Sequence, residues 1–244
     1  MERIYREDVL LRASHMDFMN TWKPSAILEV MQEAAGRHAE DIGFGRNAIL
    51  PQGLVWAVTR LEVEMDRYPH HGETVHVETF PTATRRWFFP RYFLFKDQKG
   101  HELGRAGSLW VLMDLKTRKM VKPDAMAALL PDNSDLPAPM GLPATVYEVG
   151  GVSVPGTYVP QYADLDMNGH VNNTRYMDLC CNALGIETMR TQCLHRFAVN
   201  YSNEIRPGQI LQTELRQLNR DFSFSGVSEV GRHFDVGGEL MDRP

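Results

Sequence analysis

The spacing of apolar residues predicts one long helix early in the chain. Pro24 suits the first turn of a helix, and apolar residues then recur every three or four positions. The buried face of this helix is expected to carry Ile27, Leu28, Met31, Ala34, Ala35, His38 and Ile42. Residues 3–12 are expected to form a strand before it and residues 13–23 a loop. Gly43 and Gly45 follow the helix and are expected to end it.

Strand-like segments follow this helix. Residues 54–65 close with near-perfect alternation of apolar and polar side chains, which is typical of a half-buried strand. Three further segments, at residues 74–79, 87–96 and 106–115, have the same character. A long helix followed by an antiparallel meander predicts a sheet that curls around the helix.

The second half of the chain repeats this order. Residues 116–145 are basic at first and then rich in proline, which indicates an inter-domain connection with one short helix near 124–130. A strand near 151–160, a polar loop at 161–170, a helix at 172–184, and strands at 198–205, 210–218, 222–230 and 233–239 follow. We therefore predict an N-terminal domain at 1–130, a linker at 131–148 and a C-terminal domain at 149–244.

The two halves can be overlaid by adding 149 to the first. Asp17 then falls on Asp166, because 17 + 149 = 166. Met19 falls on Asn168 and Thr21 on His170 by the same shift. If the halves are duplicates, one has a polar cluster that the other has lost.

Composition narrows the class of protein. The chain has 244 residues, 43% hydrophobic and 23% charged, which is ordinary for a globular protein with two modest cores. The net charge of −5 argues against a general nucleic-acid binder. The cysteines, Cys180, Cys181 and Cys193, are odd in number and form no CxxC pair, so we expect no disulfide framework, metal site or cofactor. With no signal peptide or apolar run of about 20 residues, a bacterial type of cytoplasm is expected.

The least ordinary segment holds three polar residues in alternation. Asp166, Asn168 and His170 would face the same way in an extended loop. They lie just before a predicted helix N-terminus, whose free N–H groups can polarise a carbonyl oxygen. The same residue types are also typical of a polar turn and helix cap, with Asn172 or Asn173 as the cap residue. The residues by themselves leave both interpretations open.

Residues 164–176 resemble the plant and bacterial acyl-acyl carrier protein thioesterases of the FatA/FatB type. Residues 54–61, 66–75 and 105–114 resemble the same family, so the similarity covers nearly the whole chain. The resemblance implies an α+β tandem hotdog fold, in which each half is an antiparallel sheet wrapped around a long central helix. It also implies that the C-terminal repeat is catalytic and that the N-terminal repeat binds most of the acyl chain.

The family's Asp-x-Asn-x-His motif matches Asp166, Asn168 and His170, and its distant glutamate matches Glu204. Many relatives carry cysteine directly after that glutamate. The residue here is Ile205, which excludes a Cys/His mechanism at that position. Two routes remain: Asp166 attacks the thioester and forms an anhydride, or Glu204 with His170 activates water. Asn168 would orient His170 or donate to the developing oxyanion.

The resemblance implies hydrolysis of fatty acyl-acyl carrier protein thioesters, which releases the fatty acid and ends chain elongation. The partner would be an acyl carrier protein with a 4'-phosphopantetheine-linked acyl chain, and the chain would act as a monomer or homodimer. An acyl-CoA thioesterase and a non-catalytic acyl-binding hotdog protein are the alternatives. A hotdog hydratase or dehydratase fits the motif less well.

Two groups of residues are candidates for substrate contacts. The acyl pocket is expected to include Met19, Trp22, Ile27, Leu28, Met31, Ala34, Ala35 and Trp56, although these residues would equally form an ordinary core. Acyl carrier protein is acidic, and its docking surface is expected among Arg85, Arg86, Arg91, Lys116, Arg118, Lys119 and Lys122. Such basic runs are more often simply solvated.

Overall fold

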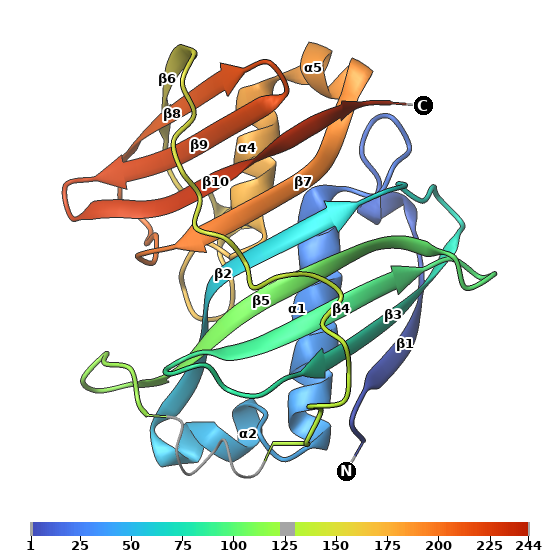
Figure 1. Cartoon of the computed structure of the whole chain (residues 1–244). Coiled ribbons are helices and arrows are strands. Elements are labelled where there is room, and N and C mark those ends of the chain that lie inside the picture. Colours follow the sequence, from blue (N-terminus) through green and yellow to red (C-terminus); the bar gives the residue numbers. More distant parts are fainter. Residues whose placement is uncertain (1, 123–129, 244) are drawn as a thin grey trace. The chain divides into compact units, whose positions relative to one another are not determined.

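The computed structural model describes residues 2–122 and 130–243 (Figure 1). The chain divides into two compact units, one formed by Met1–Lys23 and Ile27–Pro143 and the other by Pro24–Ala26 and Ala144–Pro244. The short helix predicted near 124–130 lies outside the described residues, apart from Leu130 at its end.

The first unit is an antiparallel sheet with a long helix along one face (Figure 1). Its helix is α1 (Pro24–Asp41), with a short α2 (Arg46–Ile49) and the 3-10 turns η1 (Ala13–His15) and η2 (Leu50–Gln52). Its strands are β1 (Tyr5–Leu10), β2 (Leu54–Met65), β3 (Thr74–Pro81), β4 (Phe89–Lys96) and β5 (Glu102–Asp114), in the spatial order β1-β3-β4-β5-β2. The four strands predicted after the helix are confirmed, but only β3, β4 and β5 form the predicted meander, because β2 pairs with β5.

The face of α1 predicted to be buried is buried. Its seven apolar or histidine positions, from Ile27 to Ile42, are at most 5% exposed. Side chains of the sheet such as Val77, Phe93 and Phe95 are also fully buried. The helix is stable here because its apolar stripe leaves water against the sheet, at roughly 25 cal/mol per Å² of apolar surface.

The second unit has the same plan. Its helices are α4 (Arg175–Leu184) and α5 (Ile186–Thr191), and η3 (Tyr162–Asp164) precedes α4. Its strands are β6 (Val152–Tyr158), β7 (Gln192–Tyr201), β8 (Leu211–Leu218), β9 (Asp221–Ser228) and β10 (Gly231–Asp242), in the order β7-β10-β9-β8-β6. Strand for strand, this order corresponds to that of the first unit, which supports the overlay of the two halves.

Two elements predicted in the second half have the wrong bounds. The strand expected at 198–205 is β7, which ends at Tyr201, because the amides of Ser202 and Asn203 both turn to the carbonyl of His233. The helix expected from residue 172 begins at Arg175. Helices α2 and α5 were not predicted, since four and six residues are too few to show a period.

Candidate active site

The loop before α4 closes on itself. The amide of Asp166 donates to the carbonyl of His170 over 2.9 Å, and the amide of Gly169 donates to the carbonyl of Asp166 over 3.0 Å. Gly169 has φ +76°, in the left-handed region that a residue without Cβ adopts at least cost. Leu165 and Val171 form an isolated β-bridge on either side. The loop therefore has a fixed backbone before any side-chain contact is counted.

Asp166 binds the donors of its own loop. Its Oδ1 accepts hydrogen bonds from the amides of Asn168, at 2.8 Å, and His170, at 3.4 Å. Its Oδ2 accepts one from Nδ2 of Asn168 at 3.2 Å. Carboxylates of this kind stabilise tight turns by replacing backbone acceptors. Asp166 and Asn168 thus hold the loop that presents His170.

Glu204 reaches the same loop from the segment after β7. Its Oε2 lies 3.2 Å from Nε2 of His170, and the two side chains are 34% and 24% exposed. The two residues are 34 positions apart (204 − 170). The amide of Val171 donates to the carbonyl of Ile205 over 2.9 Å and ties the two segments together. The structure therefore brings all four predicted catalytic residues into one cluster within the second unit.

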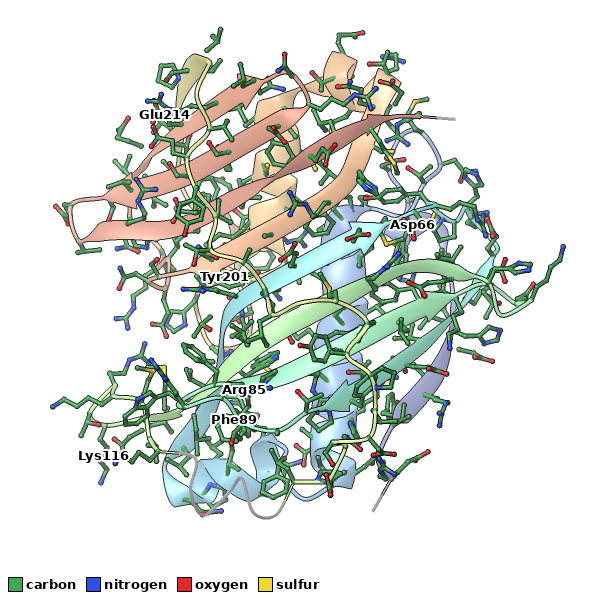
Figure 2. The ribbon with its side chains drawn as sticks, in the orientation of Figure 1. Asp66, Arg85, Phe89, Lys116, Tyr201 and Glu214 are labelled. Atoms are coloured by element: carbon green, nitrogen blue, oxygen red, sulfur yellow. The ribbon has the colours of Figure 1, made fainter. Side chains whose placement is uncertain are left out.

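Two further residues, which the sequence did not reveal, surround this pair. Arg206 places Nη2 3.3 Å from the same Oε2 of Glu204 and is exposed. Tyr176, buried on α4, packs its ring edge-on against Tyr201 (labelled in Figure 2) and Phe234, at centroid distances of 5.3 and 4.8 Å. Burial, with the carboxylates of Glu204 and Asp166, raises the pKa of Tyr176. Its phenol therefore stays protonated beneath the carboxylates.

No cysteine takes part in this cluster among the described residues. Cys180 and Cys193 are buried and Cys181 is half-buried. Burial raises the pKa of the Cys180 thiol, which disfavours the reactive thiolate. Ile205, the residue after Glu204, is fully buried. Residues 2–122 and 130–243 contain no group of three or more His, Cys, Asp or Glu side chains placed to hold a metal ion.

The residues predicted to line the acyl pocket belong to the first unit and are mostly buried there. Trp22 is fully buried and contacts the ring of Phe95 edge-on at 5.5 Å. Trp56 is half-buried, donates its indole N–H to the carbonyl of Phe44 over 2.8 Å, and meets Phe89 edge-on. The residues on α1 form its buried stripe, whereas Met19 is 36% exposed. Their contact with an acyl chain stays a prediction.

Arg91 does not belong to a docking surface, and that part of the prediction is wrong. It is 8% exposed, and its guanidinium donates to Nδ1 of His38 over 3.0 Å and to Oγ1 of Thr79 over 3.2 Å. Burial lowers the pKa of Arg91 to about 10. The side chain points inward because alternate residues of β4 face the helix. No pattern in the local sequence separates it from Arg85 and Arg86.

The other predicted docking residues are exposed and gather at one end of the first unit. Arg85 and Arg86 lie in the turn between β3 and β4, and the basic run from Lys116 to Lys122 follows β5. Because β4 and β5 are antiparallel, with Phe89 opposite Trp110, the start of β4 and the end of β5 are neighbours. Figure 2 labels Arg85, Phe89 and Lys116 in this region.

Comparisons with known proteins fit this site. The chain matches the model of the acyl-ACP thioesterase N-terminal domain over residues 2–129 and that of the C-terminal domain over residues 151–232. It belongs to the acyl-ACP thioesterase family. The four-residue cluster of Asp166, Asn168, His170 and Glu204 lies entirely within the part matched by the C-terminal model.

Individual relatives agree with the family. The chain is 26% identical to an oleoyl-acyl carrier protein thioesterase of Coriandrum sativum, over 98% of this chain and 69% of the relative. It is 29% identical to the acyl-[acyl-carrier-protein] hydrolase FATB2 of Cuphea viscosissima, over 98% of this chain and 61% of the relative. Against a third curated relative it spans 54% of the length, so this chain corresponds to only part of these proteins.

A solved structure confirms the fold. The crystal structure of an acyl-ACP thioesterase from Bacteroides thetaiotaomicron matches with a TM-score of 0.89 at 25% identity, over 98% of both chains. The predicted tandem hotdog fold of this chain is therefore confirmed. No helix among the described residues is long and apolar enough to cross a membrane.

Proposed function

We propose that this chain hydrolyses fatty acyl-acyl carrier protein thioesters and releases the free fatty acid. The observation that carries the proposal is the 3.2 Å contact between Nε2 of His170 and the carboxylate of Glu204. A base paired with a carboxylate beside a rigid loop is what the hydrolysis of an electrophilic thioester requires. Family membership supplies the substrate class.

Water activated by the pair is the route that the contacts favour. If the neutral imidazole of His170 donates Nε2–H to Glu204, its lone pair lies on Nδ1. We propose that Nδ1 takes a proton from water as the water attacks the carbonyl carbon, while Glu204 stabilises the resulting imidazolium. The tetrahedral intermediate then collapses, the carbon–sulfur bond breaks and the pantetheine thiolate leaves with a proton from the imidazolium.

Asp166 supports the loop in this proposal and does not attack the substrate. Both of its oxygens accept hydrogen bonds from loop donors, which lowers their nucleophilicity. Asp166→Asn keeps an acceptor oxygen for the two backbone amides, whereas Asp166→Ala removes it. We expect the asparagine variant to retain at least about tenfold more turnover than the alanine variant, as expected for a role in positioning. Equal loss of turnover in both folded variants would favour the nucleophilic route.

The first unit is proposed to bind the acyl chain, and the exposed basic residues to receive the carrier protein. In support, the α1 stripe is apolar and the six exposed cations named above lie at one end of the same sheet. Acyl carrier protein is acidic, so cations at one sheet end would speed its encounter. The reaction would take place in the cytoplasm, as part of fatty acid biosynthesis.

The decisive experiment compares turnover of one acyl chain linked to carrier protein and to coenzyme A. We expect kcat/KM to be at least about tenfold higher with the carrier-linked substrate, an advantage of about 1.4 kcal/mol. Higher kcat/KM with the CoA thioester would identify an acyl-CoA thioesterase. Tight binding of acyl chains without turnover of either substrate would indicate a non-catalytic binding protein.

A further inference from the structure

Strand β10 contains a β-bulge that binds the backbone just before Glu204. The register of β10 against β9 shifts between Arg232 and Phe234, so that His233 is the extra residue. Its carbonyl accepts the amides of Ser202 at 2.8 Å and Asn203 at 3.1 Å, the two residues before Glu204. Bulges of this kind re-aim a side chain and are common beside active sites.

The side chain of His233 also binds this segment of backbone. It is fully buried, and its Nδ1 lies 3.0 Å from the carbonyl oxygen of Glu204. A carbonyl oxygen only accepts, so Nδ1 carries the proton. Nε2 then accepts from the hydroxyl of Ser228 at 2.7 Å, and Ser228 Oγ in turn accepts the amide of Val230 at 3.3 Å. Both ring nitrogens are therefore engaged, and the ring is held from both sides.

The first unit provides a natural comparison. Its register also shifts, between Phe95 and Lys96, and leaves Leu103 as the extra residue. The carbonyl of Leu103 accepts the amides of Asp66 at 2.9 Å and Arg67 at 3.1 Å, as His233 does for the corresponding turn. Leucine therefore suffices to form the bulge and its backbone bonds. At this bulge the first unit has a leucine side chain, whereas the second unit has an imidazole that contacts the carbonyl of Glu204.

We infer that His233 is a positioning residue for the thioester hydrolysis, acting through the backbone of Glu204. This inference rests on the function proposed above. The Nδ1–H bond fixes the peptide of Glu204, and thereby its Cα, so that the carboxylate meets Nε2 of His170. A displacement of about 1 Å in a catalytic group can cost about a hundredfold in rate. His233 itself is fully buried and would act only through the backbone of Glu204.

The test replaces His233 by the residue that the first unit uses. His233→Leu is expected to fold, because Leu103 occupies the same bulge, and to lose about 30-fold or more in kcat with KM changed less than about threefold. His233→Asn places an amide N–H where Nδ1 lies and is expected to recover kcat to within about fivefold of the wild type. Leu103→Val, an equally buried change in the matching bulge, is the control for general loss of packing.

Two outcomes would overturn the inference. One is a His233→Leu variant whose kcat lies within about twofold of the wild type. The other is a folded His233→Asn variant that is no more active than His233→Leu. Nitrogen-15 NMR of the wild type shows, without substrate, which ring nitrogen of His233 carries the proton. A tautomer protonated on Nε2 would also contradict the inference. Failure of the wild type to hydrolyse any acyl thioester would instead refute the proposed function, while the tautomer would still report on the bond to Glu204.

Discussion

The loop before α1 and the loop before α4 have the same backbone but different side chains. In the first, the amide of Asp17 donates to the carbonyl of Thr21 over 2.8 Å, and the amide of Asn20 donates to the carbonyl of Asp17 over 3.1 Å. In the second, the amide of Asp166 likewise donates to the carbonyl of His170 over 2.9 Å. The left-handed residue is Asn20, with φ +60°, in one loop and Gly169 in the other.

Both aspartates use their carboxylates in the same way. Oδ1 of Asp17 accepts the amides of Met19 and Thr21, each at 2.9 Å, and Oδ2 accepts the hydroxyl of Thr21 at 2.9 Å. The contacts of Asp166 match these almost one for one. Since the aspartate performs this role in a loop without histidine, it is a structural feature of the repeat.

Under the proposed function, the chemistry therefore resides in the side chains that differ. The amide of Trp22 donates to the carbonyl of Pro69 over 3.1 Å, as that of Val171 does to Ile205. This correspondence places Tyr68 where the second unit has Glu204. The first unit thus keeps the scaffold but has threonine and tyrosine in place of the imidazole and the carboxylate.

The largest expected effect is a difference in kcat between variants of the catalytic pair and variants of the corresponding residues in the first unit. Glu204→Gln and His170→Ala are each expected to lower kcat by about a thousandfold, within the range for general acid–base groups. Their counterparts in the first unit, Tyr68→Phe and Thr21→Ser, are expected to change kcat by less than about twofold. Steady-state hydrolysis of an acyl-carrier substrate measures both. Near-normal turnover in either of the first two variants would refute the assignment of the site.

Removing the aspartates tests their shared role. Asp17→Ala loses the bonds to Met19 and Thr21, and we expect the free energy of unfolding to fall by about 2 kcal/mol, at roughly 0.5–1.5 kcal/mol for each bond. Its kcat should stay within about threefold of the wild type. Asp166→Ala should lose a similar amount of stability and, in addition, most turnover. Urea unfolding and kinetics on the same samples distinguish the two; full stability in both variants would contradict the structural role.

A smaller effect, on KM and its dependence on salt, should distinguish the exposed cations from the buried Arg91. Reversing Lys116 and Lys119 to glutamate is expected to raise KM for acyl-carrier substrate several-fold at low salt and to flatten its dependence on ionic strength. Arg91→Met is expected to change stability and leave the salt dependence unchanged, because Arg91 is buried. If the lysine variant kept the wild-type salt dependence, the carrier protein would dock elsewhere.

The smallest effect, on the pH dependence of stability, concerns His38, a buried histidine on α1 of the first unit. Burial, together with the charge of Arg91, lowers the pKa of His38 in the folded state. The unfolded chain, with a histidine pKa of about 6.5, therefore binds more protons. Stability should fall as the pH drops below about 6.5 and level off below the lowered folded value.

His38→Gln should remove this part of the pH dependence. The chain's tryptophans, Trp22, Trp56, Trp87 and Trp110, all lie in the first unit, so urea unfolding followed by tryptophan fluorescence reports on that unit. A wild-type midpoint that rises as the pH falls from 7 to 5, relative to the glutamine variant, would contradict the neutral buried histidine.

Local sequence patterns were sufficient for helix α1, for strands such as β2 and for one side of the site. The stripe on α1 follows the helical period, and β2 was predicted with its observed bounds because its alternation is regular. Asp166, Asn168 and His170 lie within one short loop whose residue types dictate a turn. Periods and turn preferences act between near neighbours, and they can be read from the sequence alone.

Only the tertiary structure decided the other side of the site. Glu204 approaches His170 because β7 ends at Tyr201 and the next residues turn to the bulge at His233. Likewise, Arg91 is buried whereas Arg85 and Arg86 are exposed, because Arg91 lies within β4 and those two precede it in a turn. Such contacts depend on strand register and on closing long loops, which no local pattern specifies. For that reason the local sequence indicated His170 and its loop, whereas the tertiary structure brought Glu204 and the supporting bulge at His233 to them.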